Sequence, residues 1–207
     1  MMKYLQKSLI VIGLSFFCSS AYTQVTAKFS TSKTTGCGNT EIEFIDQSTG
    51  SPTTWEWNFG NGVKKTEKVS KSYKFAYPAG TYTVVLKVSN GTSTNVTSTT
   101  ITINPMPKPD FDVQSFSGCV STEAVFTDQT ESDSPITKYG WVFGDAGNSS
   151  VQNPSHTYIG EGVYTVGLTV TDANGCKDTK IKENVIEVTK PLTLAFAAAG
   201  TESCAAP

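Results

Sequence analysis

The chain has 207 residues, enough for one or two domains, and its apolar content of 38% and charged content of 16% are those of a globular protein. Threonine, serine, valine and glycine dominate, which favours β-rich structure over disorder or long helices. Every basic residue is a lysine, and because nucleic-acid readers rely on arginine for bidentate contacts, we expect no nucleic acid partner.

The first segment, residues 1–23, has the layout of a secretory signal peptide. A lysine-bearing start precedes an apolar run over 9–17 that is too short to span a bilayer, and small residues follow. We expect cleavage after Ala21 or before Gln24. A lipid anchor on Cys18 is the competing interpretation, but the bulky phenylalanine before it argues against this. No other segment could cross a membrane, so we expect a secreted or cell-surface protein.

An internal repeat organises the rest of the chain. A phenylalanine precedes a cysteine by eight residues three times, and "EIEFIDQS" (41–48) matches "EAVFTDQT" (123–130). The predicted order is a first unit over 24–104, a proline linker over 105–109, a second unit over 110–190 and the start of a third over 191–207. Since 17 residues are too few to bury a core, we expect the chain to be a fragment of a longer protein.

Within each unit the apolar residues alternate with polar ones, as in "GTYTVVLKV" (80–88) and "GVYTVGLTV" (162–170). A period of two marks half-buried strands, and turn signals recur about every ten residues. The predicted fold class is all-β, with tandem immunoglobulin-like antiparallel β-sandwiches of about seven strands each. Tyr82 and Tyr164 should lie near the start of the penultimate strand of each unit, with the ring buried and the hydroxyl bonded to nearby backbone.

A second repeated stretch, "WNFGNG" (57–62) and "WVFGDAG" (141–147), raises the question of a phosphate or metal loop. A phosphate-binding P-loop needs a lysine and a hydroxyl residue after its glycines, then a helix, and neither follows here. The stretch instead predicts a corner, with core aromatic residues and turn glycines that tolerate positive φ. The core residues are Trp57, Phe59, Trp141 and Phe143, and the turn residues are Gly60, Asn61, Gly144 and Asp145.

These motifs resemble the PKD (polycystic kidney disease) domain family. The second unit carries W-x-F-G-D, then N-P-x-H-x-Y with His156 and Tyr158, then G-x-Y-x-V-x-L-x-V, while the first unit is degenerate, with Asn61 in place of the aspartate. The resemblance implies non-catalytic, extracellular immunoglobulin-like modules that contact protein or carbohydrate and space other domains. The leader, the tandem units and "DANGC" are similar to secreted Bacteroidetes-type surface proteins.

Several side chains are candidates for bonds or ligands. Export makes disulfides reasonable, and we predict Cys119–Cys176 within the second unit, although the first and last hairpins of such a sandwich lie at opposite ends. Cys37 then has no obvious partner, and Cys204 would pair within the rest of a third unit. No Cys-x-x-Cys pair exists to hold zinc.

Other candidate positions lie in loops. Asp145, Asp172 and Asn174 offer oxygen ligands for calcium, although such residues are usually solvated turn formers. Tyr77 and Phe116 could contact a ligand, or could fold onto their own core. His156 lacks the partners of a catalytic base and is expected to pack beside the turn.

The sequence therefore predicts no enzyme and no cofactor in this chain. The first functional hypothesis is a set of binding or spacer modules of an adhesion-type surface protein, with an extracellular protein or polysaccharide and the neighbouring domains of a longer chain as partners. The alternative is the accessory arm of a secreted hydrolase, a peptidase or polysaccharide-degrading enzyme, whose catalytic domain lies elsewhere.

Overall fold

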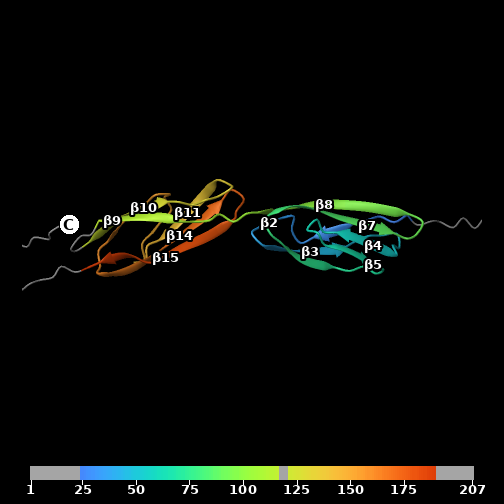
Figure 1. The fold of residues 1–207 in the computed structure, drawn as a ribbon, viewed down its shortest axis with the longest axis horizontal. Coiled ribbons are helices and arrows are strands. Elements are labelled where there is room, and N and C mark those ends of the chain that lie inside the picture. Colours follow the sequence, from blue (N-terminus) through green and yellow to red (C-terminus); the bar gives the residue numbers. More distant parts are fainter. Residues whose placement is uncertain (1–23, 117–120, 190–207) are drawn as a thin grey trace, which may run out of the picture.

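Alternating apolar residues produce fifteen strands in the computed structural model, which describes residues 24–116 and 121–189 (Figure 1). The first sandwich consists of β1 (Phe29–Thr31), β2 (Thr35–Cys37), β3 (Thr40–Asp46), β4 (Thr54–Asn58), β5 (Lys64–Glu67), β6 (Tyr73–Tyr77), β7 (Gly80–Ser89) and β8 (Thr94–Asn104). The second consists of β9 (Phe111–Phe116), β10 (Thr122–Asp128), β11 (Ile136–Val142), β12 (Asn148–Ser149), β13 (Ser155–Tyr158), β14 (Gly162–Asp172) and β15 (Lys177–Val188). The described residues contain no helix that could cross a membrane.

Each sandwich has two sheets. In the first, a three-stranded sheet of order β1-β3-β6 faces a five-stranded sheet of order β2-β8-β7-β4-β5. In the second, the orders are β13-β10-β9 and β12-β11-β14-β15. All pairings between these strands are antiparallel except β2 with β8. The prediction of tandem all-β, immunoglobulin-like sandwiches is confirmed.

Large aromatic rings fill the space between the sheets, as the repeated motif predicted. Trp57 on β4 and Phe44 on β3 meet edge to face across the first core, with ring centroids 6.3 Å apart. Trp141 and Phe126 make the corresponding contact in the second core, with tilted rings whose centroids are 5.3 Å apart. Truncating a ring of this kind to alanine typically costs about 3–5 kcal/mol, so these side chains account for a large share of each domain's stability.

The two sandwiches lie end to end and are joined by the short linker (Figure 1). Pro107 and Pro109 of the linker are buried. Lys108 exchanges two backbone hydrogen bonds with Glu131 of the second sandwich, at 2.8 and 3.1 Å. The linker is therefore part of the packed junction.

A disulfide also joins the two sandwiches. Cys37, at the end of β2, is bonded to Cys176 in the β14–β15 turn, with the Cα atoms 5.5 Å apart and a sequence separation of 139. Gly38 beside it donates a backbone hydrogen bond to Asn104, just before the linker. We call this bond the interdomain disulfide.

The predicted Cys119–Cys176 pairing is wrong, because Cys176 is bonded to Cys37. The physical reason is that the first and last hairpins of such a sandwich lie at opposite ends. Strand β9 begins at Phe111 beside the linker and ends at Phe116, at the opposite end of the sandwich from the β14–β15 turn. Cys119 itself, the leader over 1–23 and the predicted third unit over 191–207 lie outside the described residues.

Candidate functional site

The corner after β11 holds the second sandwich's histidine. Asp145 Oδ1 accepts the backbone N–H of Gly147 at 2.9 Å, and its Oδ2 lies 2.7 Å from His156 Nε2. The imidazole stacks on Phe143 with ring centroids 4.2 Å apart. Burial raises the pKa of the Asp145 carboxyl, but the hydrogen bonds from His156 and Gly147 outweigh it and leave the pKa below its ordinary value.

This Asp–His pair has the geometry of a structural clamp. In a catalytic triad a serine or cysteine would bond to the other side of the imidazole. Among the described residues the histidine ring is instead enclosed by Phe143 and by the edge of Tyr158. His156 thus packs beside the turn as expected, with a carboxylate partner that the sequence did not reveal.

The tyrosines form two kinds of anchor. Tyr82 donates to Pro78 O at 3.0 Å and Tyr164 to Gly160 O at 2.7 Å, which confirms the predicted hydroxyl bonds, although both rings are only half-buried. Tyr158, fully buried, donates to Phe143 O at 3.0 Å.

Tyr77, predicted as a possible ligand contact, has an exposed fraction of 0% and donates to Phe59 O at 2.9 Å. That prediction is wrong, because Tyr77 is the last residue of β6 and points into the core rather than standing in a loop. Burial, with a smaller effect of the neighbouring Tyr82, raises the pKa of Tyr77 to about 12. The other predicted contact, the side chain of Phe116, lies outside the described part of the structure.

The three candidate calcium ligands do not converge. Asp145 follows one end of β11, whereas Asp172 pairs with Ile136 at the other end. Asp172 is buried and accepts the backbone N–H groups of Asn174 and Cys176 at 2.9 and 2.8 Å, while Asn174 donates to Ser134. These oxygens build turns, and the described residues contain no cluster of three or more metal-ligating side chains. Asp145 and Asp172 therefore do not share one calcium site.

Asp172 has a structural task in the junction between the sandwiches. Its two backbone bonds fix the β14–β15 turn, which places Cys176, 1% exposed, against Cys37. The sequence "DANGC" indicates the turn, but no sequence pattern indicates that Cys37 is the partner of Cys176.

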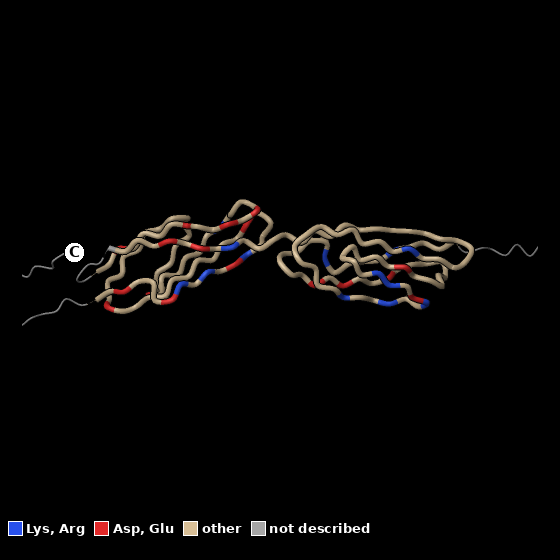
Figure 2. Tube along the Cα trace, in the orientation of Figure 1, with Lys and Arg blue, Asp and Glu red and all other residues tan. Residues whose placement is uncertain are grey.

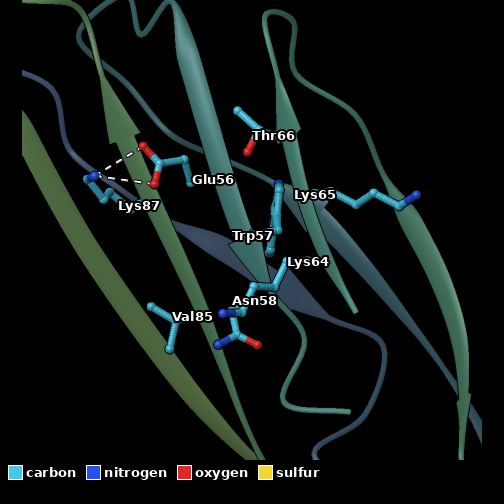
Figure 3. Close-up of a pocket in the computed structure, with 8 residues that line it drawn as sticks. All are labelled: Glu56, Trp57, Asn58, Lys64, Lys65, Thr66, Val85 and Lys87. Atoms are coloured by element: carbon cyan, nitrogen blue, oxygen red, sulfur yellow. Dashed lines mark hydrogen bonds and ion pairs between the residues drawn. The ribbon is translucent and has the colours of Figure 1, made fainter. Parts of the chain in front are cut away.

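A shallow hollow on the outer face of the first sandwich is the candidate contact site, and sequence reasoning missed it. It has a volume of about 270 Å³ and lies over β4, β5 and β7 (Figure 3). Lys87 Nζ lies 3.0 and 3.3 Å from the two carboxylate oxygens of Glu56. The lining residues are Glu56, Trp57, Asn58, Lys64, Lys65, Thr66, Val85 and Lys87.

Comparison with known proteins finds a matching domain family and several similar proteins. The PKD domain family matches residues 23–105 and 104–188. Collagenase ColA of Bacillus cereus is 37% identical over 108 residues, 51% of this chain and 10% of the collagenase. Collagenase ColA of Clostridium perfringens is 36% identical over the same shares. The match thus spans about a tenth of each collagenase's length.

Among solved structures, the PKD1 domain of Vibrio anguillarum Epp is 31% identical, with a TM-score of 0.37, and the match covers 42% of this chain and 99% of that domain. The PKD1 domain of the Vibrio cholerae metalloprotease PrtV is 29% identical, with a TM-score of 0.36, over 41% of this chain and 99% of that domain. Both family matches together take in the two sandwiches and their linker. The chain therefore belongs to the PKD domain family and carries two such domains in tandem.

Proposed function

We propose that this chain is a rigid, non-catalytic arm of an extracellular protein, which holds the parts on either side of it at a fixed spacing and orientation. PKD domains are generally non-catalytic modules, and the leader pattern and a structural disulfide both fit an oxidising compartment outside the cytosol. A role in adhesion at the cell surface is the form of this function that we favour.

The interdomain disulfide is the observation that carries the proposal. Two domains joined by a linker move relative to each other by default, unless a large apolar interface prevents it. Here Cys37–Cys176 adds a second covalent connection beside the linker, and the Lys108–Glu131 backbone pair fixes the linker to the second sandwich. Two covalent connections and a linker held in place oppose hinge motion.

The test is small-angle scattering on residues 24–207 in oxidised form and on the Cys37→Ser/Cys176→Ser variant. We expect the oxidised chain to fit a single elongated shape and the variant to need a broad ensemble of interdomain angles. Cys119→Ser is the matched control, because it removes a cysteine and leaves the interdomain disulfide in place. A broad ensemble in the oxidised chain would refute the rigid arm, and an equally narrow ensemble in all three proteins would show that the disulfide is not what makes the arm rigid.

The collagenase matches support a second candidate, an accessory arm of a secreted hydrolase. The two candidates differ in what the longer protein carries. A reading frame beyond Pro207 with a metal- or nucleophile-bearing domain would identify the hydrolase arm. Further PKD-like units that end in a surface-sorting segment would support the adhesion protein.

A further inference from the structure

Strand β8 has a long edge that no other described strand covers. It pairs with β7 from Thr94 to Ile103, but on its other side only Thr102–Asn104 pairs with β2. The uncovered stretch reads "TNVTSTTI" (94–101), which is rich in β-branched residues and has no charged residue. A long, uncharged strand edge is a template for pairing with another strand.

The backbone groups on this edge can be assigned from the bond at its covered end. Thr102 donates its N–H to Thr34 O at 2.9 Å, on the side away from β7. Residues of an antiparallel strand alternate in the side to which their backbone groups point. The N–H and C=O groups of Val96, Ser98 and Thr100 therefore face the same way as those of Thr102, and no described strand pairs with them.

The N-terminal segment approaches the start of β8 without covering this edge. Val25 N–H donates to Ser93 Oγ at 3.0 Å, and Ala27 N–H donates to Asn95 Oδ1 at 2.9 Å. These bonds end on side chains, so they leave the backbone groups of β8 available to a further strand.

Strand β15 of the second sandwich is the matched comparison, because the pairs Tyr82–Ile101 and Tyr164–Ile186 occupy the same register. Its register with β14 shifts between Tyr164 and Val166, whereas β8 follows β7 without interruption. Charges and irregularities keep edge strands from pairing with other chains. The charged residues of β15 are Lys177, Asp178, Lys180, Lys182, Glu183 and Glu187, and β8 has none.

The remaining sheet edges of the described chain are short or charged. Strands β1, β2, β12 and β13 have at most four residues each. Strands β5 and β6 contain lysines, and β9 contains Asp112. Among the described strands, β8 is therefore the one that combines a long free edge with no protective device.

We propose that β8 pairs antiparallel with β8 of a second copy of this chain, about a two-fold axis at Val96. In this register Thr94 lies opposite the partner's Ser98, and Val96 lies opposite the partner's Val96. Each opposed pair exchanges two backbone hydrogen bonds. Val96, whose side chain is 55% exposed in the single chain, gains an apolar cross-strand neighbour.

The covered end of β8 determines this register. An axis at Ser98 would bring the partner's Thr94 opposite Thr102, whose N–H is already bonded to Thr34. An axis at Val96 instead brings the partner's β7–β8 turn, residues 90–93, beside Thr100 and short of β2. The two-fold axis makes the interface isologous, so one edge serves both copies.

Charge favours a second copy at this edge. Residues 24–104 contain eight lysines and five acidic residues, a formal charge of +3, so two first sandwiches repel each other wherever their lysines meet. Figure 2 shows the trace of β8 free of charged residues, with lysines on the side of β5. Pairing through β8 thus brings the copies together where this repulsion is weakest.

The proposed dimer has its second sandwiches at opposite ends. Strand β8 runs along the long axis of the arm (Figure 1), and antiparallel pairing reverses the direction of one copy. The first sandwiches then lie side by side in the middle. Whatever follows each second sandwich is presented at one of two distant ends.

The experiment is sedimentation equilibrium of residues 24–207 that carry Cys119→Ser/Cys204→Ser, which excludes disulfides between copies through these cysteines and leaves the interdomain disulfide in place. One pair of strands forms a small interface, so we expect a reversible dimer with a Kd of about 10–100 μM. Val96→Lys places like charges opposite each other and should raise the Kd at least about tenfold. Ile181→Lys, the matched change at a residue of β15 that is 60% exposed, should change the Kd by less than about twofold.

Cysteine crosslinking tests the register independently. Opposed residues that exchange backbone hydrogen bonds have Cα atoms about 5.5 Å apart, a separation that a disulfide can bridge. In the same background, Val96→Cys should form a disulfide-linked dimer on mild oxidation. Ser98→Cys, which faces the partner's Thr94, should form little.

Three results would overturn the proposal. They are a monomer at every concentration up to about 1 mM, an equal Kd for Val96→Lys and the parent protein, or crosslinking of Ser98→Cys as fast as that of Val96→Cys. Each leaves the rigid arm unaffected, since the test of the arm depends on the interdomain disulfide and not on β8.

Discussion

The corner after β11 and its counterpart after β4 use two different pairs of side chains for the same task. In the second sandwich His156 stacks on Phe143 and bonds to Asp145, whereas in the first Phe75 packs against Phe59 with tilted rings, whose centroids are 4.5 Å apart. The turn residue there is Asn61, whose Oδ1 accepts the N–H of Val63 at 3.1 Å. The turn aspartate thus occurs with a histidine in the second sandwich, and the turn asparagine occurs with a phenylalanine in the first.

The Asp145 carboxylate should make stability depend on pH. Its folded pKa lies below the ordinary value of 3.8, so its stabilising effect is complete above that value and is lost as the pH falls through the folded pKa. We expect Asp145→Asn to lower the free energy of unfolding by about 1 kcal/mol at pH 7, discounted for partial exposure, and by almost nothing near pH 2.5.

Urea unfolding at both pH values checks this expectation. Asp145→Asn/His156→Phe reproduces the pair found in the first sandwich and should recover most of the loss at pH 7. A destabilisation by Asp145→Asn that is the same at pH 7 and pH 2.5 would show that the charge on Asp145 is irrelevant.

The glycine turn that follows β11 shows how strongly backbone geometry restricts the sequence. Gly144 has a φ of +88°, and a Cβ at this position would lie 2.6 Å from the carbonyl oxygen of Thr165 on β14. Gly175 in the β14–β15 turn has a similar φ of +82° but open space around it. The two glycines therefore separate the cost of positive φ from the cost of a clash.

We expect Gly175→Ala to cost about 1 kcal/mol, the usual penalty for a side chain at positive φ, and Gly144→Ala to cost at least about 1 kcal/mol more. Thermal unfolding of the two variants, followed by calorimetry, measures the difference. Equal costs would mean that β14 moves aside and that the contact with Thr165 does not constrain the turn.

Strands and corners could be predicted from the sequence because they depend on local patterns. The alternation in "GTYTVVLKV" and "GVYTVGLTV" predicts β7 and β14, and the repeated glycines predict the corners. Tyr77 was misplaced although Tyr73, Phe75 and Tyr77 alternate in the same way, since the following "PAG" suggested a loop. Asp145 and Asp172 were grouped as ligands because spacing along the chain does not show that they lie at opposite ends of β11.

The junction between the sandwiches could not be predicted in this way. Cys37 and Cys176 belong to different domains, and their proximity depends on how the linker orients one sandwich on the other. The hollow on the first sandwich likewise needs β4, β5 and β7 side by side, although Lys64 and Lys87 are far apart in sequence. Both features arise from placement in space rather than from a motif.

The interdomain disulfide also determines how the arm would respond to mechanical tension. A force applied between residues 24 and 189 can bypass the 138 residues between the two cysteines through the sulfur bridge. Only 28 residues remain extensible, about 100 Å of chain at full extension, against about 580 Å for all 166 residues after reduction.

Single-molecule stretching with and without a reductant measures these contour lengths. Extensions well beyond about 100 Å without a reductant would show that the disulfide does not bypass the residues between the two cysteines. The arm would hold its length under shear even when both sandwiches unfold, because the residues between the two cysteines do not carry the force.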